Sequence, residues 1–179
     1  IARILDDLSV TYIEGGWPGA SPNVDDFFEK MKSVELKNAK LTAFGSTRRA
    51  VNPAEKDILL NKIVNCGASV ACIFGKSWDL HVTTALNISL EQNLEIIEDS
   101  LAFLKASGME ALYDAEHFFD GYKANPEFAL ETLKAAERGG AECLILCDTN
   151  GGTMPSEIAE IIAKIKPELK TPLGIHAHN

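Results

Sequence analysis

The stretch Cys143-Leu144-Ile145-Leu146-Cys147-Asp148-Thr149-Asn150-Gly151-Gly152 decides the fold. Its first five residues are all apolar, and polar residues and two glycines follow directly. A short, continuously apolar run is typical of a strand that is buried on both faces, as the strands of parallel sheets are. The stretch therefore predicts a parallel strand with polar side chains at its carboxyl end.

Comparable apolar runs occur along the whole chain. They cover Val10–Glu14, Leu41–Phe44, Ser69–Phe74, Ala111–Ala115, Cys143–Cys147 and Leu173–His176, the last of which extends to Ala177 as a short buried strand. Consecutive runs end about 30 residues apart, which is the size of one βα unit. We therefore expect six successive strand-and-helix units.

Helix start and stop signals separate these runs. Asn52 and Asn125 each precede a proline, and Ser89 opens a capping box, which are three ways in which helices begin. Glycines at 67, 108 and 139–140 mark helix ends. We expect helices over residues 52–67, 89–108, 125–139 and 155–165, and shorter ones over 1–8 and 24–34.

Two α/β architectures fit six such units. One is an open doubly wound sheet, and the other is a (β/α)8 TIM barrel of which only a part is present. A whole barrel takes about 250 residues, and this chain has 179. No Gly-x-Gly-x-x-Gly motif follows a strand, and no P-loop motif occurs. We favour the barrel and expect residues 1–179 to form one partial catalytic domain of about six βα units that lacks the first and last strands.

The composition excludes several classes of function. The formal net charge is −9 at pH 7, which argues against binding to nucleic acid or to an anionic membrane. No apolar run approaches the length of a membrane span. The four cysteines form no C-x-x-C pair and suit buried free thiols in a reducing compartment. We therefore expect a cytoplasmic protein.

Ionisable and polar residues gather at the predicted strand ends, where a barrel builds its active site. They include Glu14, Ser46, Thr47, Arg48, Lys76, Trp78, His81, Asp114, Glu116, His117, Asp148, Thr149, Asn150, His176 and His178. Burying so many polar groups around one mouth costs stability unless they serve a ligand. This accumulation predicts an enzyme.

His176 and His178 are two residues apart on the last predicted strand, so both imidazoles project from one face. Neutral imidazole is a common ligand of divalent metals. The pair predicts a metal site, and the alternative is two unrelated histidines near a loop. Zn, Mn and Fe suit such ligands, and Mg stays open.

Other strand-end residues have two interpretations each. Glu116 lies two positions beyond Asp114 on the same side of its strand, where it suits a general base. Asp148 either caps the next helix or acts in the site, and His117 either acts in the site or has a packing or capping role. Cys147 has no partner in the sequence that would make it a nucleophile, so we expect a buried thiol.

Six motifs together resemble one family of enzymes. They are Ile13-Glu14-Gly15-Gly16-Trp17-Pro18-Gly19, Phe44-Gly45-Ser46-Thr47-Arg48-Arg49, Phe74-Gly75-Lys76-Ser77-Trp78-Asp79, Asp114-Ala115-Glu116-His117-Phe118-Phe119-Asp120-Gly121, Cys147-Asp148-Thr149-Asn150-Gly151-Gly152 and Gly174-Ile175-His176-Ala177-His178-Asn179. The chain resembles the citramalate synthase branch of the isopropylmalate/homocitrate synthase family. These enzymes are metal-dependent TIM barrels related to hydroxymethylglutaryl-CoA lyase. The resemblance covers essentially the whole chain.

The resemblance implies a Claisen condensation of acetyl-CoA with a 2-oxo acid. Pyruvate would give (R)-citramalate and CoA, in isoleucine biosynthesis. It implies that His176 and His178 bind the divalent metal and that Glu116 is the base or holds it. Thr149 would hydrogen-bond the keto-acid carboxylate. Asp114 and Glu14 would belong to the substrate site.

One part of the family's pattern is absent from this sequence. The metal-binding aspartate of the family lies in an arginine-aspartate-glycine motif, which does not occur here. We therefore expect the 179-residue stretch to be inactive alone. The resemblance also implies a homodimer of the full-length protein, with small molecules as its partners.

Three other interpretations stay open. The same barrel could take a larger 2-oxo acid, or run in reverse as a hydroxymethylglutaryl-CoA-type lyase. The more distant alternative is a non-enzymatic open α/β domain that binds a metal or a partner.

Overall fold

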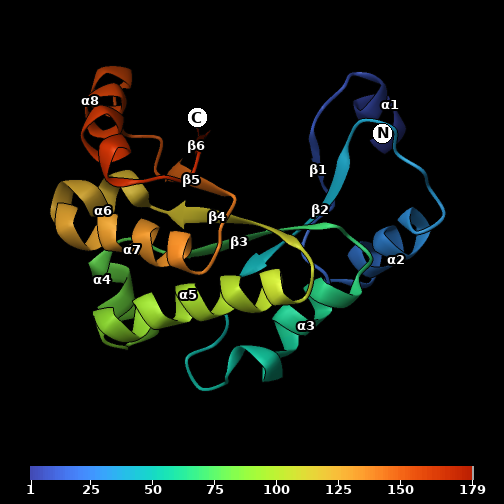
Figure 1. Ribbon diagram of the computed structural model, residues 1–179, viewed down its shortest axis with the longest axis horizontal. Helices are drawn as coiled ribbons and strands as arrows, with labels where there is room; N and C mark the ends of the chain where they lie inside the picture. Colours follow the sequence, from blue (N-terminus) through green and yellow to red (C-terminus); the bar gives the residue numbers. More distant parts are fainter. Residues whose placement is uncertain (179) are drawn as a thin grey trace.

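The computed structural model describes residues 1–178, which form a curled six-stranded sheet with helices along its outer face (Figure 1). The strands are β1 Tyr12–Glu14, β2 Lys40–Ser46, β3 Val70–Lys76, β4 Glu110–Glu116, β5 Cys143–Asp148 and β6 Leu173–Ala177. They lie side by side in chain order, and every neighbouring pair is parallel. A doubly wound sheet would reverse its strand order at a switch point. The predicted barrel is therefore confirmed as an open part of a barrel wall, with β1 and β6 at its edges.

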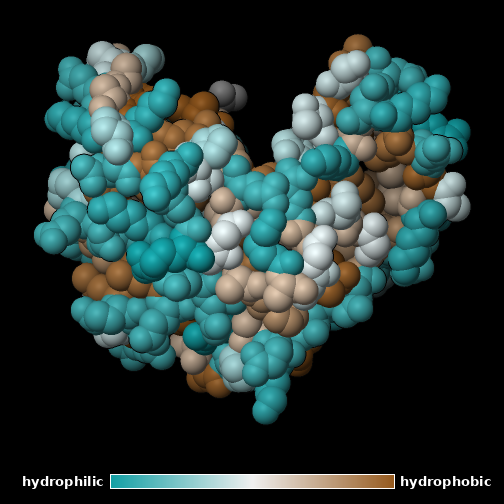
Figure 2. Space-filling model, viewed as in Figure 1, coloured by the Kyte–Doolittle hydropathy of each residue, from teal (hydrophilic) through white to brown (hydrophobic). Residues whose placement is uncertain are grey.

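Helices connect the strands. They are α1 Ala2–Asp7, α2 Pro22–Met31, α3 Ile58–Asn65, α4 Asp79–His81, α5 Leu90–Ala106, α6 Phe118–Ala124, α7 Pro126–Arg138 and α8 Pro155–Ile165, with the short 3₁₀ turns η1 Ala54–Lys56 and η3 Lys166–Glu168 and the π-helical turn η2 Val82–Leu86. Helices α3, α5 and α7 follow one another along one side of the sheet (Figure 1). The surface is hollowed on the other side, between the part that carries α8 and the part that carries α1 (Figure 2).

The two faces of the sheet have different side chains. The outer face carries small residues such as Ala43, Ala71 and Ala111, all fully buried, and these let the helices pack closely onto the strands. The inner face carries a second apolar cluster around Val70, Cys72 and Leu112. Burial on both faces explains why the strands read as continuous apolar runs.

The start of α3 differs from the prediction. The sequence placed a cap at Asn52, but α3 begins at Ile58 and the cap is Asp57. The Asp57 carboxylate is buried and accepts hydrogen bonds from the backbone N–H groups of Leu59 (2.9 Å), Leu60 (3.1 Å) and Arg49 (3.0 Å). The Asp57 carboxylate thus accepts from backbone N–H groups that come before it in the sequence, at Arg49, and after it, at Leu59 and Leu60. The segment before Asp57 forms only the η1 turn.

Other predicted boundaries match the structure more closely. Ser89 and Asn125 cap α5 and α7 with their side chains, and α8 spans Pro155–Ile165 as expected. The sequence did not predict α4, η2 or α6. All four cysteines are free, and Cys143 alone of the four is half-buried rather than buried.

The prediction that the last strand is buried was wrong for the structure of residues 1–178. The residues of β6 are exposed from Ile175 onward. In residues 1–178, β6 pairs with β5 alone and forms the edge of the sheet, so nothing covers its other side. Within the same described residues, no helix is long and apolar enough to cross a membrane.

Candidate active site

Polar side chains of the inner face meet at the carboxyl end of the sheet. Residues two apart on a strand share a face, which places Asp114 and Glu116 of β4 together above the apolar cluster. The register sets Lys76 beside Glu116 and Cys147 beside His176. A cavity of about 230 Å³ opens between them. It is lined by Phe44, Phe74, Asp114, Glu116, Cys147, Thr149, His176 and His178.

The two histidines of the predicted metal site lie together. The imidazoles of His176 and His178 are stacked, with ring centroids 4.7 Å apart and 20° between their planes. On the side of β4, Nδ1 of His176 lies 3.5 Å from Oδ2 of Asp114. Two imidazoles with a carboxylate nearby are a donor set that Zn, Mn and Fe accept. The residues present therefore fit part of a divalent metal site.

Asp114 is buried at the floor of this cavity. Its Oδ1 accepts a hydrogen bond from the thiol of Cys72 at 3.5 Å. Burial raises the pKa of Asp114, and the contacts with Cys72 and His176 oppose that rise. The pKa of this carboxyl is therefore set by burial and by the neighbouring side chains rather than by contact with solvent.

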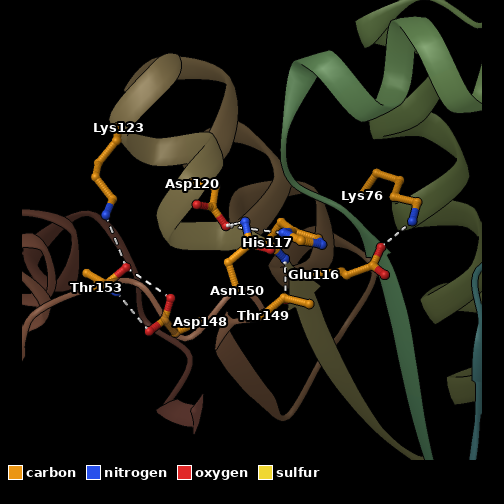
Figure 3. Close-up of polar contacts among 9 residues, drawn as sticks. All are labelled: Lys76, Glu116, His117, Asp120, Lys123, Asp148, Thr149, Asn150 and Thr153. Carbon is orange, nitrogen blue, oxygen red and sulfur yellow. Dashed lines mark hydrogen bonds and ion pairs between the residues drawn. The ribbon is translucent and has the colours of Figure 1, made fainter. Parts of the chain in front are cut away.

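Glu116 forms an ion pair with Lys76 across the β3–β4 register (Figure 3). Both side chains are about three-quarters buried, with exposed fractions of 25% and 22%. The sequence had named Lys76 as a strand-end residue but had given it no role. Its place beside Glu116 depends on how β3 pairs with β4, which the sequence of neither strand alone contains.

Thr149 lies just after β5 and contacts the end of β4. Its hydroxyl oxygen accepts a hydrogen bond from the backbone N–H of His117 at 2.9 Å (Figure 3). His117 adopts a left-handed backbone conformation, with φ of 54°, which ends β4 and turns this N–H toward Thr149. Since the Thr149 oxygen acts here as acceptor, its hydroxyl proton stays available to the cavity that Thr149 lines.

His117 and Asp148 serve the surrounding loops. The His117 ring lies 3.1 Å from the Asp120 carboxylate, which also accepts from the side chain of Asn150 at 3.1 Å. The buried Asp148 carboxylate accepts from the backbone N–H (3.1 Å) and hydroxyl (3.0 Å) of Thr153 (Figure 3). Asp148 therefore closes the loop before α8, but it does not cap the helix, whose N-cap is Met154.

Glu14 is the predicted site residue that does not line the cavity among the residues described. It ends β1, opposite Thr42 of β2. Burial raises the pKa of Glu14, the negative charge of Asp114 raises it further, and His176 opposes the rise. Glu14 therefore shares the electrostatic environment of Asp114 while standing at the open edge of the sheet.

An aromatic wall completes the site, and the sequence analysis missed it. Phe44 and Phe74 line the cavity with their rings stacked, 5.6 Å between centroids, and Trp17 meets both edge-on. The available signal was the recurrence of phenylalanine before glycine at two successive strand ends. The indole Nε1 of Trp17 is buried without a hydrogen-bond partner in residues 1–178.

The chain is similar in sequence to known enzymes over its whole length. A family model described as HMGL-like matches residues 1–179. The (R)-citramalate synthases of Geobacter sulfurreducens and Aquifex aeolicus are 55% and 54% identical to it, and each alignment covers 100% of the chain and 34% of the relative. A 2-isopropylmalate synthase of Methanocaldococcus jannaschii is 30% identical, over 100% of the chain and 32% of that protein. The chain thus spans about a third of the length of these curated relatives.

Solved structures share the fold. An HMG-CoA lyase of Bacillus subtilis superposes with a TM-score of 0.77 at 17% identity, over 99% of the chain and 59% of the lyase. An HMG-CoA lyase of Brucella melitensis gives 0.75 at 14% identity, over 99% and 62%. At these identities the likeness concerns the fold.

Proposed function

Because this chain belongs to the HMGL-like family, we propose that it forms part of the catalytic barrel of an enzyme that condenses acetyl-CoA with pyruvate, giving (R)-citramalate and CoA. Five relatives named (R)-citramalate synthase, 44–55% identical over all of the chain, support this choice. The observation that carries the proposal is the cavity in which five of the six predicted site residues meet. The enzyme is thereby an acyltransferase that acts on a 2-oxo acid.

His176 and His178 would hold a divalent metal together with a ligand from outside this stretch. The candidates for this divalent metal are Zn, Mn, Fe and Mg. When bound, such an ion supplies Lewis-acid polarisation of the keto group of the 2-oxo acid. We propose that the stretch is inactive alone, because the arginine-aspartate-glycine motif of the resemblance does not occur in it.

Glu116 is proposed to remove a methyl proton from acetyl-CoA. The acetyl carbon is a weak acid, so a positioned base is needed for it to attack the keto carbon. The Lys76 ammonium, which is paired with Glu116, fixes the direction of the carboxylate and places positive charge next to it. The condensation is completed when water cleaves the thioester and releases CoA.

Thr149, Asp114 and Glu14 are proposed to bind the 2-oxo acid. The backbone N–H of His117 occupies the Thr149 oxygen, which leaves the hydroxyl proton to donate to the substrate carboxylate. Asp114 lines the same cavity, and Glu14 lies outside it, at the end of the edge strand β1. Phe44 and Phe74 exclude water from one side, where the methyl group of pyruvate would pack.

The test is Glu116→Gln in the full-length protein, with Glu110→Gln as the matched control. Glu110 lies on the same face of the same strand but at its opposite end, where it contacts Tyr12 and Lys40. We expect Glu116→Gln to lower turnover by about 10²–10⁴-fold with unchanged metal content, and Glu110→Gln to keep turnover near wild type. Equal turnover in the two variants would remove Glu116 from the mechanism.

We propose further that the full-length protein is a cytoplasmic homodimer whose partners are its two small-molecule substrates. The resemblance to the synthase family supports the dimer, and the acidic composition supports the absence of nucleic-acid and membrane partners.

A further inference from the structure

The ion pair of Lys76 and Glu116 lies at the point where the sheet ends (Figure 3). Lys76 is the last residue of β3, and the register of β3 with β4 stops at the pair of Lys76 with Glu116. Past this pair, the N–H of Ser77 donates to the carbonyl oxygen of Glu116 at a longer 3.3 Å. The sheet therefore holds one side of the peptide group between Lys76 and Ser77, and holds it weakly.

Asn93 holds the other side of the same peptide group. Its side-chain amide donates to the carbonyl oxygen of Lys76 at 2.9 Å. Asn93 lies near the start of α5 and is 2% exposed. Asparagine is a poor helix former, and a buried amide costs stability unless it is hydrogen-bonded. Leucine would suit this position better for helix formation and burial alone, so the contact with Lys76 is what the amide provides.

Ser77, which follows the peptide group, is anchored to α7. Ser77 and Thr132 are both fully buried, and the hydroxyl of Thr132 donates to Oγ of Ser77 at 3.0 Å. The hydroxyl of Tyr113 lies 3.4 Å from the same oxygen. A buried network whose members are hydrogen-bonded to one another makes the segment that contains it rigid. Helices α5 and α7 thus fix, from the outer side of the sheet, the backbone that carries Lys76.

We infer that Asn93 and Thr132 are positioning residues for Lys76. Through the ion pair they also set the direction of the Glu116 carboxylate. The inference rests on the function proposed above, in which Glu116 removes a proton from acetyl-CoA. Within residues 1–178, neither Asn93 nor Thr132 is part of the cavity lining, so both act through Lys76. A misplacement of 1 Å at a reacting group costs about 100-fold in rate, which is why contacts outside the site affect turnover.

Two variants of similar shape remove these contacts one at a time. Asn93→Leu removes the donor to the Lys76 carbonyl, and Thr132→Val removes a hydroxyl of the buried network. Ser100→Ala is the matched control. Ser100 is fully buried on the same helix as Asn93, and its Oγ accepts from the backbone N–H of Arg48, after β2, at 2.9 Å. The control therefore loses the same kind of contact at a different strand end.

The first experiment measures the reactivity of the Lys76 amine in the full-length protein and does not depend on the proposed reaction. Lysines are acetylated with limiting acetic anhydride, and mass spectrometry compares Lys76 with the exposed Lys164 of α8. An ammonium held by a carboxylate reacts slowly, because only the free amine is a nucleophile. We expect Asn93→Leu and Thr132→Val each to raise the relative acetylation of Lys76 about fivefold, and Ser100→Ala to leave it unchanged.

Either positioning variant is sufficient for this experiment if the other does not fold. Relative acetylation of Lys76 that stays at the wild-type value in the folded variants overturns the proposal. An equal rise in Ser100→Ala also overturns it, because the effect would then follow from the loss of any buried contact of α5.

The second experiment is a double-mutant cycle on turnover. We expect Asn93→Leu to lower kcat by about 10–100-fold, with the KM for the 2-oxo acid and the metal content unchanged. In a Lys76→Met background, Asn93→Leu should change kcat by less than about twofold, because its effect passes through the ammonium that is already missing. A loss of the same size in both backgrounds overturns the proposal. Absence of CoA release by the wild type would contradict the proposed function instead, and the acetylation experiment would still decide whether Asn93 positions Lys76.

Discussion

Gly121 of α6 lies where no other residue fits. A Cβ placed on it would come 2.2 Å from the carbonyl oxygen of Ser77 and 2.9 Å from Cα of Trp78. Ordinary contact begins at 3.4 Å, so Gly121→Ala requires α6 and the Ser77–Trp78 backbone to separate by about 1.2 Å (3.4 − 2.2). Both are backbone segments, which yield less easily than the end of a side chain. The glycine is therefore required by close approach of the chain after β3.

The cost follows from this displacement. Overpacking of a well-packed site costs about 1–3 kcal/mol, and the higher helix propensity of alanine returns at most about 1 kcal/mol. We expect Gly121→Ala to destabilise the full-length protein and to lower its unfolding midpoint. Ser77 directly follows Lys76, so the shift also disturbs the ion pair with Glu116 and lowers turnover.

The assay is thermal unfolding followed by circular dichroism, together with turnover at saturating substrate. Gly152→Ala is the matched control, because a Cβ on Gly152 meets nothing within 4 Å among residues 1–178. If Gly121→Ala unfolds at the same temperature as Gly152→Ala and the wild type, the inferred contact between α6 and the Ser77 backbone is wrong.

Three further predictions concern single side chains. Asp57→Ala should cost about 2 kcal/mol or more in urea unfolding, because three backbone N–H groups lose their acceptor, whereas Asp57→Asn should cost less. Hydrogen bonds from the backbone N–H groups of residues 37–39, that of Lys37 having the largest effect, lower the pKa of Asp6 in the folded protein. The stability that the ionised Asp6 contributes is therefore present above its unfolded pKa of about 3.9 and is lost as pH falls through the lower folded value. In acid titration, Asp6→Asn should lose less stability than the wild type. Thr149→Val should raise KM for the 2-oxo acid about 10–100-fold, and Thr149→Ser should restore it; an unchanged KM in the valine variant would contradict the assigned hydrogen bond.

The sequence predicted the sheet well because a strand that is buried on both faces is a continuous run of apolar residues. Strands such as β3 and β4 carry apolar residues on the outer face, against the helices, and again on the inner face. The starts of α5 and α7 were also predictable, since Ser89 and Asn125 cap them with their own side chains.

The start of α3 was not predictable in the same way. Asn52-Pro53 is an acceptable start signal by itself, and only the tertiary contact of Asp57 with Arg49 shows why the later aspartate caps the helix. Local signals compete, and the three donors gathered around one buried carboxylate decide between them.

The candidate site was predictable residue by residue but not as an arrangement. Alternation along β4 placed Asp114 and Glu116 on one face. Alternation along the last predicted strand likewise placed His176 and His178 on one face. The ion pair of Glu116 and the approach of Cys147 to His176 arise from the register between strands. Register is fixed by the pairing of whole strands, which no single run of sequence contains.

The measurement that tests the central claim most directly is CoA release by the full-length protein, with acetyl-CoA and a panel of 2-oxo acids, before and after chelator treatment. The account predicts release that is fastest with pyruvate, lost with chelator and restored by a divalent metal. Preference for a larger 2-oxo acid would contradict the proposed substrate while keeping the reaction. Absence of release with every acid would contradict the proposed condensation itself.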